Sequence, residues 1–189
     1  MAGRRLLLVR HAEPVVDLNV AAPLWHLSGR GRLAAAAMAP HLPHVRAVWS
    51  SQEPKALETA HILAEAWDEA VWVHPDLAEA RLALGPLEQE EFARRVRRYL
   101  DGFEEAADEP RAQAKERVVA AVRHILGEGP SDVAVVSHGR ILTLLLEGLL
   151  GRPLGARHWE RIAMPDWTLL DSDRWTVLAG FAAAFDALG

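Results

Sequence analysis

The chain has 189 residues, half of them hydrophobic and a quarter charged, so we expect a single folded domain over residues 1–189 rather than a disordered chain. The net charge of −5 and the pI near 6.0 exclude the broad basic surface of a nucleic-acid-binding protein. The absence of cysteine excludes disulfides, thiolate metal sites and thiol nucleophiles, and it fits a reducing compartment.

The apolar segments are too short for a signal peptide or a membrane span. The first apolar run covers residues 6–9, shorter than the h-region of a signal peptide. The most apolar stretch, residues 142–151, is interrupted by Glu147 and is about half the length of a membrane-spanning helix. We therefore expect a soluble, cytoplasmic protein.

Strand-like and helical patterns alternate along most of the chain. An unbroken apolar run, typical of a strand buried on both faces of a sheet, lies at residues 6–9, and similar runs lie within residues 45–50 and 132–139. The second run leads into a helical pattern at residues 53–67, and the third leads into another at 140–151. A strand followed by a helix, repeated, predicts a mainly parallel sheet.

Apolar residues at helical spacing predict two more helices, within residues 88–106 and 111–129. Residues 167–181 have the pattern of a hairpin, with Ser172 and Asp173 in the turn. The expected architecture is an α/β three-layer sandwich: a central, mainly parallel sheet flanked by helices, with a C-terminal antiparallel hairpin.

Polar residues follow each of the three apolar runs, where open parallel sheets bind their ligands. These residues are Arg10 and His11 after the first run, Ser50, Ser51 and Lys55 after the second, and Ser137, His138 and Gly139 after the third. Two histidines and two cations are therefore expected to converge beyond the carboxyl ends of neighbouring strands.

This combination of side chains suits a phosphoryl group. An imidazole can attack phosphorus, while arginine and lysine hold the phosphoryl oxygens and a second imidazole supplies further hydrogen bonds. Helices beginning at Pro54 and just after Gly139 would direct backbone N–H groups and their positive ends into the same space. We therefore predict a phosphate-binding pocket that includes Gly139.

Four motifs occur in an order that resembles the histidine phosphatase superfamily, in its phosphoglycerate-mutase-like branch. They are RHAE, LSGRGRLAA, SSQEPKALETA and VVSHGR. The resemblance extends from Leu6 to the helix that ends near Leu150, and the terminal hairpin is compatible with it.

The resemblance implies a role for each matching residue. His11 would be the nucleophile that becomes phosphorylated, and Arg10 and His138 would bind the phosphoryl group. Glu79, in the stretch HPDLAEA, would be the proton donor, although a mobile loop could instead bring in a glutamate of the next segment. Those alternatives are Glu88, Glu90 and Glu91.

The sequence departs from the family pattern at three positions. Lys55 stands where the family has a phosphate-binding arginine, and it keeps the charge without the two-pronged guanidinium. Ala12 stands in place of a glycine, and Asp17, assigned to substrate binding, in place of a common asparagine. The alternative for Lys55 is a solvated helix residue beside Glu58, in which case Arg30 or Arg140 becomes the next candidate cation.

No histidine and carboxylate cluster has the spacing of a metal site, so we expect catalysis without a metal or a cofactor. The leading hypothesis is a metal-independent phosphatase that acts on a small phosphorylated metabolite through a phosphohistidine. A phosphoglycerate mutase is one alternative, and a catalytically weakened phosphate-binding protein is another. The sequence leaves open the substrate and the oligomeric state, a homodimer included.

Overall fold

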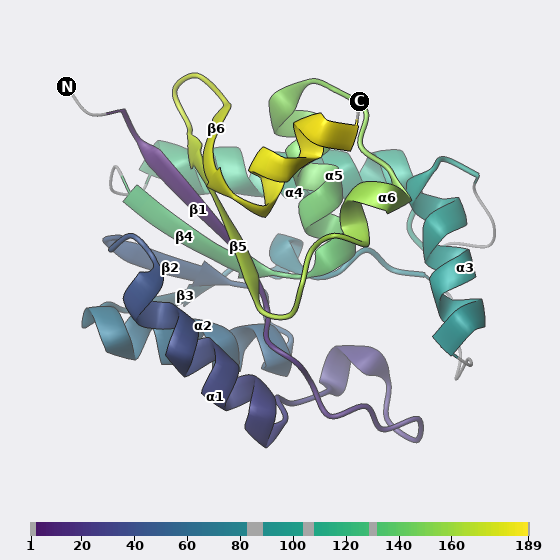
Figure 1. Ribbon diagram of the computed structural model, residues 1–189, viewed down its shortest axis with the longest axis horizontal. Helices are drawn as coiled ribbons and strands as arrows, with labels where there is room; N and C mark the ends of the chain where they lie inside the picture. Colours follow the sequence, from purple (N-terminus) through teal and green to yellow (C-terminus); the bar gives the residue numbers. More distant parts are fainter. Residues whose placement is uncertain (1–2, 83–88, 104–107, 129–131, 189) are drawn as a thin grey trace.

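The computed structural model describes residues 3–82, 89–103, 108–128 and 132–188, and within them six strands form one sheet (Figure 1). The strands are β1 (Arg5–Arg10), β2 (Ala47–Ser50), β3 (Val71–Val73), β4 (Asp132–Ser137), β5 (Asp166–Asp171) and β6 (Thr176–Gly180). Their order across the sheet is β3-β2-β4-β1-β5-β6. Strands β1, β2 and β4 are therefore neighbours at the centre of the sheet.

The strand directions confirm the predicted architecture. Strand β4 runs parallel to both β1 and β2, and β3 runs parallel to β2. Strand β5 is antiparallel to β1 and forms the C-terminal hairpin with β6. Ser172 and Asp173 lie in the turn of this hairpin, as the sequence predicted.

Helices cover both faces of the sheet (Figure 1). Helices α1 (Gly29–Met38) and α2 (Pro54–Trp67) lie on one face, and α4 (Arg111–Glu128) and α5 (Gly139–Leu150) lie on the other. The remaining helices are α3 (Gln89–Leu100), α6 (Ala156–Trp159) and four 3₁₀ segments, η1 (Ala22–Leu24), η2 (Ala39–His41), η3 (Pro75–Leu77) and η4 (Phe181–Leu188). No helix within the described residues is long and apolar enough to cross a membrane.

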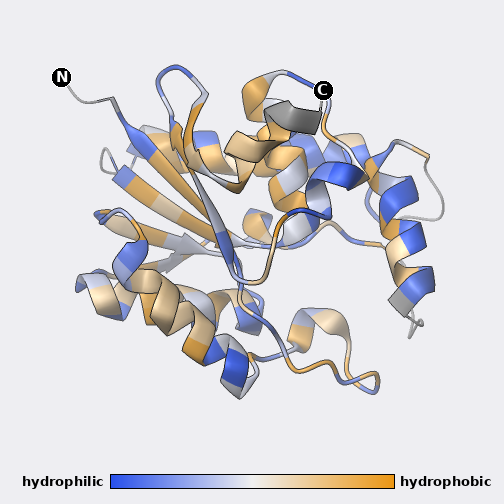
Figure 2. Ribbon diagram, in the orientation of Figure 1, coloured by the Kyte–Doolittle hydropathy of each residue, from blue (hydrophilic) through white to orange (hydrophobic). Residues whose placement is uncertain are grey.

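The central strands are largely apolar (Figure 2). They divide the core into two layers. Successive side chains of a strand point to opposite faces, so Leu6 and Leu8 of β1 pack with α4 and α5, while Leu7 and Val9 pack with α2. Burial of both faces explains why β1 reads as a continuous apolar run.

Short sequence signals determine where helices α1 and α2 begin. The hydroxyl oxygen of Ser28 accepts a hydrogen bond from the Gly31 N–H at 2.9 Å and caps α1. Pro54 is the first residue of α2, where its fixed φ suits the helix and its missing N–H is not needed. The start at Pro54 agrees with the sequence prediction.

An ion pair fixes the segment that leads from η3 to Glu79. The Arg117 side chain on α4 binds the buried Glu109 carboxylate at 2.6 Å and also donates hydrogen bonds to the carbonyl oxygens of Asp76 and Ala78. Burial acts to raise the pKa of Glu109, but the hydrogen bonds and charge of Arg117, together with Arg81, leave the pKa below its ordinary value. Arg117 thus holds the backbone immediately before Glu79.

Replacement of Arg117 by leucine is therefore expected to destabilise the fold by about 3–5 kcal/mol, because it removes the close partner of the buried Glu109 charge and leaves the Arg81 guanidinium at 4.0 Å. Urea denaturation followed by circular dichroism measures the loss. The matched control is Arg123→Leu at an exposed position of the same helix. Equal stabilities of the two variants would contradict the assignment.

Candidate active site

The candidate residues lie at the carboxyl ends of the three central strands. The backbone N–H of His11, just after β1, donates to the Ser137 carbonyl of β4 at 2.9 Å. The N–H of Ser51, just after β2, donates to the Val136 carbonyl of β4 at 3.1 Å. These bonds extend the sheet pairing by one residue and place the three polar strand ends side by side.

His11 is buried, and its contacts define its tautomer. The Nδ1 atom lies 2.7 Å from the carbonyl oxygen of Ala12, which can only accept, so Nδ1 carries the proton and Nε2 carries the lone pair. Burial, followed by the nearby His138, lowers the pKa of His11 well below its ordinary value. The imidazole is therefore neutral at neutral pH, and its Nε2 makes no hydrogen bond to another described residue.

His138 faces His11, with the two ring centroids 5.0 Å apart in an edge-to-face arrangement. Its Nε2 atom lies 2.9 Å from the hydroxyl of Ser51, and within the described part of the chain its buried Nδ1 has no hydrogen-bond partner. Burial lowers the pKa of His138 to about 3, against the opposing effect of the Glu79 charge. Two neutral imidazoles therefore lie against each other at the ends of β1 and β4.

Arg10 contributes a largely buried guanidinium beside the start of α5. It donates to the carbonyl oxygen of Ile162, and burial lowers its pKa to about 10, which still leaves it charged at neutral pH. The Cα of Gly139 packs closely here, because a Cβ would lie 3.0 Å from Arg10 Cζ and 2.8 Å from Trp159 Nε1. A glycine at 139 makes room for the guanidinium.

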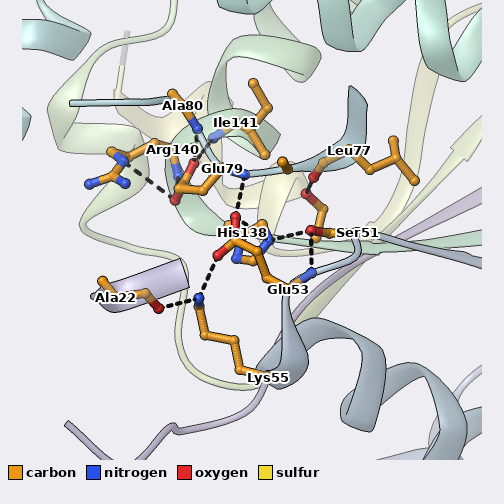
Figure 3. Close-up of polar contacts among 12 residues, drawn as sticks. Ala22, Ser51, Glu53, Lys55, Leu77, Glu79, Ala80, His138, Arg140 and Ile141 are labelled. Carbon is orange, nitrogen blue, oxygen red and sulfur yellow. Dashed lines mark hydrogen bonds and ion pairs between the residues drawn. The ribbon is translucent and has the colours of Figure 1, made fainter. Parts of the chain in front are cut away.

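Lys55 is buried, with 6 % of its surface exposed. Its ammonium donates to the Glu53 carboxylate at 2.5 Å and to the Ala22 carbonyl at 2.9 Å (Figure 3). The alternative of a solvated lysine beside Glu58 is wrong, since Glu58 binds Arg32 and His26 instead.

Glu79 lies beside His138 and caps helix α5 (Figure 3). Its two carboxylate oxygens accept the N–H groups of Arg140 at 3.2 Å and Ile141 at 2.8 Å. These are two of the amides at the helix start that the sequence suggested for phosphate binding. The carboxylate therefore takes up part of the positive helix end itself.

Asp17 is not among the candidate residues that the structure brings together. It lies on the exposed stretch after β1, and its carboxylate accepts hydrogen bonds from Asn19. Within the described residues it makes no hydrogen bond or ion pair to the other candidates. Of the alternative acids, Glu88 lies outside the described residues, Glu90 is exposed and Glu91 binds Arg94 and Arg95.

Sequence reasoning assigned no role to Glu53, although its buried carboxylate contacts Lys55 and lies 3.4 Å from His138 Nε2. The available signal was an acidic residue two positions before Lys55. Arg140, considered only as a substitute cation, has its Nε 3.4 Å from Glu79. No group of three or more His, Asp or Glu side chains within the described ranges is placed to hold a metal ion.

Comparison with known proteins identifies the family of this chain. The model of the histidine phosphatase superfamily, branch 1, matches residues 6–179, so the chain belongs to this family. The expected family resemblance is thereby confirmed. No functionally curated protein matches the sequence.

Solved structures share the fold. Mycobacterial glucosyl-3-phosphoglycerate phosphatase with inorganic phosphate has a TM-score of 0.72 and 23 % identity, covering 93 % of this chain and 96 % of that one. A histidine-to-alanine variant of Entamoeba histolytica phosphoserine phosphatase, with phosphoserine, has a TM-score of 0.75 and 16 % identity, covering 94 % and 96 %. YhfR of Bacillus stearothermophilus has a TM-score of 0.75 and 20 % identity, covering 93 % and 94 %. At these identities the likeness establishes the fold alone.

The lowered pKa of His138 predicts a pH dependence of stability. The unfolded chain protonates this histidine near pH 6.5 and the folded protein only near pH 3, so the unfolded state binds more protons between these values. Stability due to His138 is therefore present above pH 6.5 and falls as the pH drops, by about 2 kcal/mol between pH 7 and 5.

Urea denaturation of the wild type and of His138→Asn at pH 8, 7, 6 and 5 measures this contribution. The variant is expected to lose less stability than the wild type between pH 7 and 5, and the values at pH 8 give the offset caused by the substitution itself. If the stabilities of the wild type and the variant change with pH in parallel, His138 binds its proton equally well in the folded and unfolded states. That result would contradict the prediction.

Proposed function

We propose that the protein is a metal-independent phosphomonoesterase that hydrolyses a small phosphorylated metabolite through a phosphohistidine on His11. The observation that carries the proposal is the state of this side chain. His11 is a buried, neutral imidazole whose Nδ1 is bound to the Ala12 carbonyl, and whose Nε2 has no hydrogen-bond partner among the described residues. A nitrogen nucleophile needs that lone pair, and the fixed ring directs it.

Cationic and hydrogen-bonding groups around His11 support phosphoryl binding. Arg10 supplies a planar guanidinium and Lys55 an ammonium, and both match the charge spread over the phosphoryl oxygens in the transition state. The neutral His138 and the N–H of Gly139 at the start of α5 complete the proposed pocket.

The proposed reaction has two steps. His11 Nε2 attacks phosphorus and forms a P–N bond as the ester P–O bond breaks, and Glu79 gives a proton to the departing alkoxide oxygen. Water then attacks the phosphohistidine, Glu79 takes a proton from that water, and the P–N bond breaks to release inorganic phosphate and the neutral His11. To act as the acid, Glu79 must release its contacts with the start of α5.

The names of the related structures support the substrate class. Two of them are phosphatases named for phosphoserine and for glucosyl-3-phosphoglycerate, both small phosphorylated metabolites. The proposed partner of this chain is accordingly a small phosphomonoester. The stretch that carries Asp17 borders Lys55 through the Ala22 carbonyl, so Asp17 is proposed to contact the leaving group rather than the phosphoryl group.

A panel of phosphomonoesters, including phosphoserine and phosphoglycerates, tests the proposal when assayed with EDTA present. We expect the wild type to release inorganic phosphate and His11→Asn to retain less than about a hundredth of its kcat/KM, because asparagine provides no nitrogen nucleophile. Circular dichroism checks that the variant is folded.

Other outcomes identify the alternatives. Transfer of the phosphoryl group between phosphoglycerate positions, without net release of phosphate, would indicate a mutase. Phosphate binding without turnover would indicate a phosphate-binding protein. Activity that vanishes in EDTA and returns with a divalent metal would contradict the metal-independent mechanism.

A further inference from the structure

The buried carboxylate of Glu53 connects the segments that follow β2, η3 and β4. One oxygen binds the Lys55 ammonium at 2.5 Å. The other accepts the backbone N–H of Glu79 at 2.9 Å and lies 3.4 Å from His138 Nε2 (Figure 3). A single side chain thus contacts the segment after β2, the segment after η3 and the residue after β4.

The position of Glu53 in its own helix does not account for these contacts. It is the N-cap residue of α2, where a polar side chain usually accepts an N–H of the first helical turn. Its carboxylate makes no such capping bond and instead contacts Lys55, the Glu79 backbone and His138. With 7 % of its surface exposed, Glu53 is also not a solvated charge.

The pairing with Glu53 sets the position of the Lys55 ammonium. A lysine side chain carries a compact ammonium on a flexible four-carbon chain, so on its own it does not define a direction for its hydrogen bonds. Glu53 and the Ala22 carbonyl take two of the three ammonium N–H groups. The third remains for an oxygen of a bound anion.

We infer that Glu53 is a positioning residue of the phosphoryl site, whose carboxylate holds the Lys55 ammonium, the His138 imidazole and the Glu79 backbone in one arrangement. The inference rests on the proposed function of this pocket. Glu53 acts through Lys55 and does not itself touch the phosphoryl group.

A carboxylate beside a phosphate site also has an opposing effect, because its charge repels the anion. While Lys55 is present, the pair is neutral and the positioning effect outweighs the repulsion. Without Lys55, the carboxylate is left as an unpaired negative charge. Removal of the Glu53 charge is therefore expected to weaken anion binding in the wild type and to strengthen it when Lys55 is absent.

A double-mutant cycle with Glu53→Gln, Lys55→Met and the combined variant tests this reversal. The probe is inorganic phosphate, titrated calorimetrically into each protein, and p-nitrophenyl phosphate gives kcat and KM. We expect Glu53→Gln to weaken phosphate binding and lower kcat/KM by about tenfold to a hundredfold, the scale of one charge-assisted hydrogen bond. The combined variant should bind phosphate more tightly than Lys55→Met alone.

Two further variants distinguish the position of the Glu53 carboxylate from the effect of its charge. Glu65→Gln removes an exposed charge from the same helix and should change phosphate binding by less than about twofold. Glu53→Asp keeps the charge but withdraws it from Lys55, and it should also weaken phosphate binding. Thermal unfolding of every variant identifies any that do not fold, and Glu53→Asp decides the question if Glu53→Gln is among them.

The inference is overturned if Glu53→Gln has the same effect with and without Lys55, if it strengthens phosphate binding in the wild type, or if Glu53→Asp binds phosphate like the wild type. Failure of the proposed function has a different signature: the wild type binds phosphate but hydrolyses no phosphomonoester. The binding cycle then still decides the role of Glu53. A wild type that binds no phosphate contradicts both.

Discussion

The hydrogen bond between His11 Nδ1 and the neighbouring Ala12 carbonyl is the contact on which the proposed chemistry depends. It fixes the proton on Nδ1, and burial keeps the ring neutral, so the lone pair of Nε2 is available without the help of a general base. The central strands supply the rigidity for this arrangement, because β1 is buried on both faces and pairs with β4 and β5 along its length. The proposed nucleophile therefore directly follows a buried strand that is paired on both sides.

The charges around His11 are arranged in pairs rather than gathered as bare cations. Lys55 is matched by Glu53, and Arg140 lies against Glu79, while Arg10 is bound to a backbone carbonyl. Such pairing lowers the cost of burying several charges in one place. It also means that a phosphoryl group competes with resident carboxylates for its cations, which makes the placement of Glu53 and Glu79 decisive for the affinity of the pocket.

The fold could be predicted from the sequence because its main signals are local. The apolar runs, the helix start at Pro54 and the turn at Ser172 and Asp173 each depend on a few adjacent residues, and the structure has all of them. The convergence of His11 and His138 followed from a general rule about parallel strands, namely that ligands lie beyond their carboxyl ends.

The details of the site depend on contacts between residues far apart in the chain, which no local pattern reveals. The capping of α5 by Glu79 joins residues separated by more than sixty positions. The burial of Lys55 depends on the stretch around Ala22 folding over it. Asp17 matched a family position by alignment of motifs, yet its carboxylate is turned to its neighbour Asn19 on an exposed loop.

Direct detection of the covalent intermediate tests the central claim most sharply. The wild type is mixed with a phosphomonoester that it hydrolyses, and the reaction is quenched rapidly without acid. Peptide mass spectrometry should then locate a phosphoryl group on His11 that is lost in acid and stable in base. The account predicts this adduct in the wild type and its absence from His11→Asn. A phosphoryl group on a serine, or steady hydrolysis with no histidine adduct at any quench time, would contradict it.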